Sequence, residues 1–268
     1  MKKLISAPYL LWMAVFIIVP LLMVAYFAFT GSEGGFTLDN LAAVSQYTNV
    51  FIRSIWLAAI ATVICLIISY PLALILARMD KSYQSTVLMI VMLPRWMNFL
   101  LGTYAWMTIL GNNGLINMFL GQLHIEPFKM LNTPGAVVLG MVYNYLPYMI
   151  LPLYTVIAKI DTSIVEAAQD LGCNGSKVLW RVIVPLSVPG IMSGITMVFV
   201  PAISTFIISR MLGGGSNLLI GDLIEMQFLG NSYNPNLGAA ISLVLMVIIL
   251  LIMTILNQFD NDEGRVLI

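Results

Sequence analysis

Charged residues are scarce in this sequence. Only 9% of the 268 residues are charged, whereas about a quarter are charged in a typical soluble domain. The formal net charge is zero, so the chain has no broad electrostatic attraction for nucleic acid. Because a water-exposed surface needs more charge than this, the composition excludes a predominantly soluble protein.

Cysteine and histidine are also rare. Cys65 lies inside an apolar stretch and Cys173 in a polar one, far away in the sequence. Two such cysteines in different environments predict neither a disulfide nor a metal site. The single histidine, His124, lies in a polar loop and is expected at the surface.

Apolar residues are abundant and occur in long blocks. They make up 60% of the chain, and the mean hydropathy is +0.96. A membrane-spanning helix needs roughly 20 apolar residues, and the unbroken character of the blocks favours helices over a barrel. Six blocks can be drawn: Leu4–Thr30, Ile52–Ala77, Thr86–Leu110, Ala136–Ala158, Ser187–Ser209 and Leu237–Asn257. We therefore expect an all-α membrane protein with six transmembrane helices in one domain, residues 1–268.

The first block is expected to be a span and not a cleaved signal peptide. Its apolar run from Leu10 to Phe29 is longer than a usual signal core and lacks a small-x-small cleavage site. An even number of spans places both termini on one side of the membrane. Positive charges near span ends are retained in the cytoplasm, and both termini are predicted to be cytoplasmic. The cytoplasmic set is then Lys2, Lys3, Arg78, Lys81, Lys159, Lys177, Arg181 and Arg265, against Arg53, Lys129 and Arg210 outside.

The longest cytoplasmic segment, residues 159–186, is too long for a simple connection. Ser163 and Glu166 have the spacing of a capping box, which predicts a short helix. Gly172 suits the left-handed residue that ends it. Ser176 is expected to cap a second helix that runs until Pro185 interrupts it.

This segment resembles the EAA loop of permease subunits in binding-protein-dependent (type I) ABC importers. Glu166-Ala167-Ala168 is followed after three residues by Gly172, and after nine more by Val182-Ile183-Val184-Pro185. The family usually has Ile and Leu where this chain has Val182 and Val184. The resemblance implies a coupling helix that docks into a groove of a separate ATPase. That role is carried over to Glu166, Ala167, Ala168 and Gly172, and Asp170 on the same helix is a further coupling candidate.

The resemblance extends over nearly the whole chain and is closest to the first permease subunit of spermidine/putrescine importers. The segments 36–40, 133–154 and 213–229 carry it. It implies a second permease, an ATP-binding subunit dimer that holds ATP and magnesium, an extracytoplasmic solute-binding protein and a bacterial cytoplasmic membrane. No cofactor is expected in this chain. Importers of ferric iron, phosphonates or sulfate-type anions share the loop and remain alternatives for the substrate.

No nucleotide-binding motif accompanies the loop. The nearest approach to GxxxxGK[ST] begins at Gly172 and has the wrong spacing and no preceding strand. The apolar blocks also lack the row of carboxylates that a proton-coupled carrier uses. ATP hydrolysis on a partner is therefore expected, and the chain itself is not expected to be an enzyme. An integral-membrane enzyme with Glu166, Asp170 and Lys177 as its polar site is the alternative from a different class.

A pathway for polyamines would offer aromatic faces and a few carboxylates to ammonium groups. The candidates are Trp96, Tyr104 and Trp106 in the third block, Tyr143, Tyr145 and Tyr148 in the fourth, and Asp222 and Glu225 in an external segment. Trp96 and Tyr104 are eight residues apart and are expected on one side of a helix. Packing or an interfacial aromatic belt is the alternative role for the rings. Loop acids that contact the binding protein are the alternative for the carboxylates.

Arg95 lies well inside the third block. It would lie roughly 20 Å along a helix from Lys81, near the middle of the membrane. It is therefore expected to face the bundle and find a partner, such as the carbonyl that Pro94 leaves free. A cation pathway would not select Arg95, whereas an anion pathway could. Gly190 and Gly194 form a small-xxx-small pair that predicts close helix contact.

Overall fold

The computed structural model describes residues 7–31, 34–215, 217–230 and 232–266. Lys2, Lys3 and the predicted start of the first span at Leu4 lie outside the described residues. The fold is all-helical, as predicted. Within the described ranges, the only β contact is an isolated bridge between Thr30 and Phe36.

Among the described residues, four continuous helical segments are long and apolar enough to cross a membrane. The first comprises α2 (Ala7–Met13), the π-helix η1 (Ala14–Ile18) and α3 (Val19–Ala28). The second runs through α4 (Asp39–Val44), the short 3₁₀ helix η2 (Ser45–Tyr47) and α5 (Thr48–Arg78). The third and fourth are α9 (Pro134–Ile157) and α16 (Pro235–Val266). These elements correspond to the first, second, fourth and sixth apolar blocks.

The third and fifth blocks are broken. The third becomes α6 (Lys81–Trp96) and α7 (Phe99–Leu110), followed by α8 (Leu115–Gln122), with an 85° bend after Trp96. The fifth contains α13 (Val188–Ile203) and the start of α14 (Ile207–Gly213), and α13 makes a 65° bend with the segment Gly175–Leu186 that precedes the block. If each bent pair is one span, the described chain has six.

The bend corrects one expectation. Trp96 ends α6 and Tyr104 lies within α7, so the two residues do not share a helix face. The break comes from Asn98, whose side chain accepts a hydrogen bond from the Leu100 amide at 2.9 Å and starts α7 anew. The Asn98 side chain thereby pairs the Leu100 amide, which has no partner within the helix, so α7 can begin in apolar surroundings.

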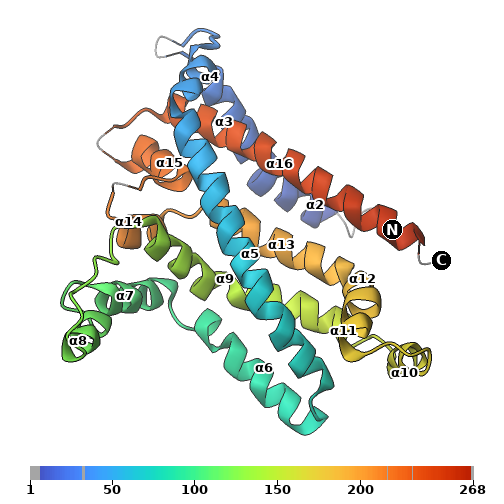
Figure 1. The fold of residues 1–268 in the computed structure, drawn as a ribbon. Helices are drawn as coiled ribbons and strands as arrows, with labels where there is room; N and C mark the ends of the chain where they lie inside the picture. Colours follow the sequence, from blue (N-terminus) through green and yellow to red (C-terminus); the bar gives the residue numbers. More distant parts are fainter. Residues whose placement is uncertain (1–6, 32–33, 216, 231, 267–268) are drawn as a thin grey trace.

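Helix α9 is the centre of the bundle, and α5 and α13 pack against it (Figure 1). Small side chains on α5 are fully buried there, including Ala58, Ala61 and Cys65. Met141 and Met149 of α9 are also fully buried. Helix α16 packs on α3 and on α15 (Ile220–Leu229), which follows the short α14 (Ile207–Gly213). The start of α2 and the end of α16 lie on the same side of the molecule as α12 (Val184–Leu186) (Figure 1).

The predicted close contact at Gly190 and Gly194 is confirmed. A Cβ atom on Gly194 would lie 2.5 Å from the Met149 sulfur, and one on Gly190 would lie 3.1 Å from the Pro152 carbonyl oxygen. Both glycines are buried. The backbone of α13 therefore approaches α9 more closely than any larger residue allows.

Gly194→Val should destabilise the subunit by about 1–3 kcal/mol, because the added methyl groups overpack the contact with Met149. Gly121→Val is the matched control, since nothing lies within 4 Å of a Cβ at Gly121. The measurement is thermal unfolding of the purified subunit in detergent. Equal melting temperatures for the two variants would contradict the role of this contact.

Candidate functional site

The predicted coupling segment forms two short helices, and the first is α10 (Thr162–Asp170). The expected cap, Ser163, does not cap it. Asp161 begins the helix instead, and its carboxylate accepts a hydrogen bond from the Ser163 amide at 3.0 Å. Hydrogen bonds from the Ser163 amide and hydroxyl lower the pKa of Asp161. Because Ser163 already lies within the first turn, its hydroxyl cannot take the capping position.

The end of α10 is as predicted. Gly172 has a φ of +83°, in the left-handed region. Its amide donates to the Gln169 carbonyl at 2.8 Å, and the Cys173 amide donates to the Ala168 carbonyl at 3.1 Å. Glycine is favoured here because an L side chain is strained at this φ.

The second helix begins two residues earlier than expected. Asn174, not Ser176, caps α11 (Gly175–Val178) and accepts from the Lys177 amide at 2.9 Å. The helix continues through the π-helix η3 (Leu179–Ile183) and α12. Pro185 does not interrupt this helix. Proline has no amide hydrogen to donate, and the π-helix immediately before Pro185 changes the backbone hydrogen-bond pattern so that this donor is not required. The bend comes at Ser187, whose hydroxyl lies 2.9 Å from that of Tyr70 on α5.

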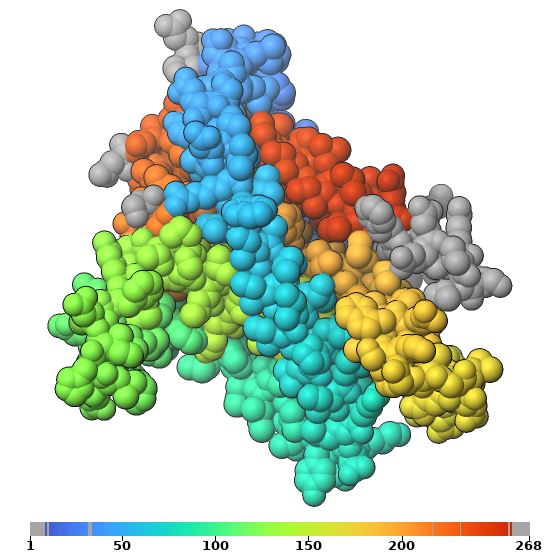
Figure 2. Space-filling view, viewed as in Figure 1, coloured from blue at the N-terminus to red at the C-terminus, as the bar shows by residue number. Residues whose placement is uncertain are grey.

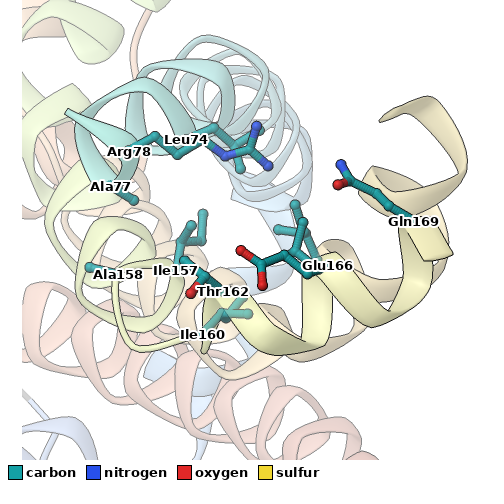
Figure 3. Close-up of a pocket in the computed structure, with 11 residues that line it drawn as sticks. Leu74, Ala77, Arg78, Ile157, Ala158, Ile160, Thr162, Glu166 and Gln169 are labelled. Carbon is teal, nitrogen blue, oxygen red and sulfur yellow. The ribbon is translucent and has the colours of Figure 1, made fainter. Parts of the chain in front are cut away.

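Helix α10 has an inner face that lines a hollow. The hollow has a volume of about 350 Å³ and lies between α10 and the ends of α5 and α9. Thr162, Val165, Glu166 and Gln169 line it from α10, at the spacing of one helix face. Figure 3 shows the Glu166 carboxylate directed into this space and Arg78 of α5 across from it. Glu166 therefore belongs to the side of α10 that faces the body of the subunit.

The other face of α10 is apolar and exposed. Ile164, Ala167 and Leu171 share it at the same helical spacing. Leu171 is 87% exposed and Ile164 is 44% exposed. An exposed apolar surface on a helix of this kind is typical of a contact with another protein. The sequence reasoning missed Leu171, although an apolar residue just before a helix-ending glycine was the available signal.

The segment that contains α10 protrudes from the molecule (Figure 2). In Figure 2 the segment that contains α10 forms a corner of the surface, away from the central helices. Ala168 is partly buried and Asp170 is exposed. The structure thus places Ala167 on the outer face and Glu166 on the inner face of the same short helix.

The predicted pathway aromatics form two pairs around α9. Trp106 and Tyr143 meet edge to face with ring centroids 5.5 Å apart. Tyr145 and Tyr148 are 6.3 Å apart. The side chains of Trp96 and Tyr104 are 69% and 58% exposed.

Arg95 has a partner of a kind that the sequence reasoning did not anticipate. Its guanidinium carbon lies 4.4 Å from the centroid of the Tyr148 ring. The expected partner, a carbonyl released by Pro94, is therefore replaced by an aromatic face. The cause is the end of α6 at Trp96, which leaves the arginine in the last turn beside α9.

The two acids that were predicted to lie in an external segment are both on α15, and both have contacts within the chain. Asp222 is 4% exposed, and its carboxylate accepts from the Leu219 amide at 2.9 Å. Burial raises the pKa of Asp222, while hydrogen bonds from Ser209 and Leu219 oppose the shift. Glu225 forms a salt bridge with Arg210 at 2.8 Å. Both acids therefore help to hold α14 and α15 in place.

The described residues hold no group of three or more His, Cys, Asp or Glu side chains that could bind a metal ion. Cys65 is buried, Cys173 is partly buried, and both are free. The polar residues of the enzyme alternative lie in the coupling segment: Glu166 lines the hollow, and Asp170 and Lys177 are exposed.

The chain is similar in sequence and in fold to permeases of known ABC transporters. The chain is 36% identical over 264 residues to the spermidine/putrescine transport system permease protein PotB of Haemophilus influenzae, covering 95% of this chain and 92% of that protein. It is 36% identical over 247 residues to the PotB protein of Escherichia coli K12, covering 88% of this chain and 90% of that protein. Its fold is similar to a chain in the crystal structure of a bacterial ABC transporter that imports the acidic polysaccharide alginate, with a TM-score of 0.83, 17% identity and coverage of 98% and 95%.

A family assignment follows from these similarities. Residues 69–262 match the family described as "Binding-protein-dependent transport system inner membrane component". This match includes the coupling segment and both broken helices. The chain belongs to this family and is the multi-pass, non-catalytic permease component of an ABC importer of the inner membrane.

Proposed function

We propose that this chain is one of two permease subunits of a polyamine importer and conducts spermidine or putrescine into the cytoplasm. The observation that supports this substrate most directly is the 36% identity, over 95% of the chain, with a permease named for spermidine and putrescine. The proposed assembly contains a second permease, an ATP-binding subunit dimer with ATP and magnesium, and an extracytoplasmic solute-binding protein. Both termini face the cytoplasm, on the side where α10 lies.

Helix α10 is the proposed contact with the ATPase. Its outer face, with Ala167 and the exposed Leu171, docks into the ATPase, and Gly172 and Asp170 complete the segment. Its inner face, with Glu166, transmits the movement to the ends of α5 and α9. Because Asp161 and Asn174 cap α10 and α11 independently, each short helix moves as a rigid unit. Alternating access then arises from two packings of the same bundle.

The proposed pathway follows the aromatic residues on α6, α7 and α9. These are Trp96, Tyr104, Trp106, Tyr143 and Tyr148, with Asp222 and Glu225 toward the external mouth. Ring faces attract ammonium groups without holding them as strongly as carboxylates do, which suits a path that substrate must leave. Exposure of Trp96 and Tyr104 supports this role, because both rings are open to a ligand.

Experiments can distinguish this proposal from two alternatives, a different substrate and a different class of protein. A permease for phosphonate, sulfate-type anions or ferric iron would contain the same coupling segment. An integral-membrane enzyme would show activity as an isolated subunit. The purified chain should not hydrolyse ATP by itself, and the coupling role would be wrong if this chain alone hydrolysed ATP or pumped solute in vesicles.

Gly172→Val should abolish most uptake while the subunit stays in the membrane, because a β-branched residue at φ +83° is strained by about 1–2 kcal/mol and shifts the end of α10. Gly172→Asn is the matched control, since asparagine tolerates this backbone conformation. Uptake by vesicles that contain the complete importer is measured. The glycine would have no conformational role if both variants behaved alike.

Leu171→Asp should reduce binding of the ATPase subunits roughly tenfold or more, because it places a charge in the apolar contact. Leu229→Asp is the matched control, because Leu229 is 82% exposed at the end of α15, away from α10. Copurification of the ATPase with tagged permease gives the readout. Unchanged copurification of the Leu171 variant would contradict the proposed docking face.

Unlabelled spermidine and putrescine should compete with labelled spermidine for uptake by the complete importer. Phosphonate, sulfate and ferric iron should not compete, because anions and a compact metal ion lack the elongated alkylammonium structure that aromatic faces recognise. Competition by an anion or ferric iron, with none by polyamines, would reject the proposed substrate and leave the family assignment intact.

A further inference from the structure

Two helix breaks meet at the tyrosine pair of α9. The first is the turn between α6 and α7, and the second is the gap between α13 and α14. A hollow of about 220 Å³ lies at the second break and is lined in part by Phe99, Tyr145 and Thr205. The Tyr145 hydroxyl donates to the Pro201 carbonyl at 3.3 Å. Tyr145 therefore borders this hollow. Its neighbour Tyr148 contacts the Arg95 guanidinium through its ring face.

The contact between Arg95 and Tyr148 has the geometry of a cation–π interaction. The distance of 4.4 Å to the ring centroid is well within the limit of about 6 Å for such contacts. Arg95 is exposed, and no carboxylate of the described residues forms a salt bridge with it. The ring face is thus the partner that the structure gives to this cation, in a segment where charge is costly.

We propose that the Arg95 guanidinium is a resident cation that occupies the aromatic site of a substrate alkylammonium group and is displaced when substrate arrives. The inference rests on the proposed polyamine transport. One ammonium group takes the face of Tyr148, and the adjoining methylene groups extend past Tyr145 toward the hollow beside Phe99. Arg95 then turns toward the open space on which its exposed side chain already borders.

A resident cation selects for elongated polycations. A ring face holds one cation at a time, so any ligand cation must first replace the guanidinium. A small monovalent ion exchanges one cation–π contact for another and gains nothing further. A polyamine gains additional contacts from its methylene groups and its other ammonium groups. Arg95 therefore serves as a specificity-determining residue in a cation pathway, which removes the conflict between its charge and that of the substrate.

The test is equilibrium binding of radiolabelled spermidine to the complete membrane complex in nanodiscs, without binding protein and without ATP. Arg95→Met removes the resident cation and keeps an apolar side chain, so spermidine should bind on the order of threefold to tenfold more tightly. Arg95→Lys keeps a cation and should stay within about twofold of the wild type. Arg95→Gln is a second neutral variant, used if the Met variant does not assemble.

A double-mutant cycle with Tyr148→Leu separates occupancy of the ring from simple charge repulsion. Occupancy predicts that Tyr148→Leu weakens spermidine binding by a larger factor in the Arg95→Met background than in the wild type, where the ring is already covered. Equal factors in both backgrounds would mean that Arg95 acts by repulsion alone and would overturn the inference. Weaker binding in Arg95→Met and Arg95→Gln would show that the arginine only anchors the bend, and would also overturn it.

These outcomes are distinct from failure of the proposed function. If the wild-type complex binds and imports spermidine but the neutral variants bind it no more tightly, the inference fails and polyamine transport stands. If the wild-type complex shows no polyamine uptake in the competition assay, the proposed substrate fails, and the inference fails with it.

Discussion

The structure depends on the need to pair every backbone amide and carbonyl group inside lipid. This need makes the chain all-helical, and it also decides where the helices can break. The break after Trp96 has the Asn98 side chain as a cap, and the bend at Ser187 has two hydroxyl groups and the Val184 carbonyl in contact. Both breaks lie against α9. Irregular backbone is thus found where protein groups replace the hydrogen bonds that lipid cannot offer.

Close packing around α9 is the second requirement, because lipid gives helices little hydrophobic reason to associate. Gly190 and Gly194 bring α13 close to α9, and alanine residues on α5 do the same from another side. The aromatic residues lie at the edge of this packed region, where α6 and α7 diverge. A rigid centre with divergent helices at its border thus holds these rings in fixed positions at the edge of the bundle.

Much of the fold was predictable from sequence because long apolar blocks and a helix-ending glycine are strong local signals. The four continuous spans and the left-handed Gly172 are confirmed. Local choices between similar residues were not predictable: Asp161 and Asn174 cap the short helices, and the expected Ser163 and Ser176 do not. The sequence reasoning recognised Pro94 but missed Asn98, so it placed Trp96 and Tyr104 on one face. The Tyr148 partner of Arg95 depends on tertiary contact, which spacing along one segment does not contain.

The hollow behind α10 bears on how the subunit can change shape. It separates the protruding helix from the ends of α5 and α9, and Arg78, Glu166 and Gln169 add polar groups to a lining that is otherwise largely apolar. A space of this size with several polar groups can hold water, whereas a dry gap would lose packing energy whenever it widened. The proposed tilting of α10 would therefore mainly exchange solvent and create no void. With water in this hollow, the proposed movement of α10 against α5 and α9 would cost little free energy and could be repeated.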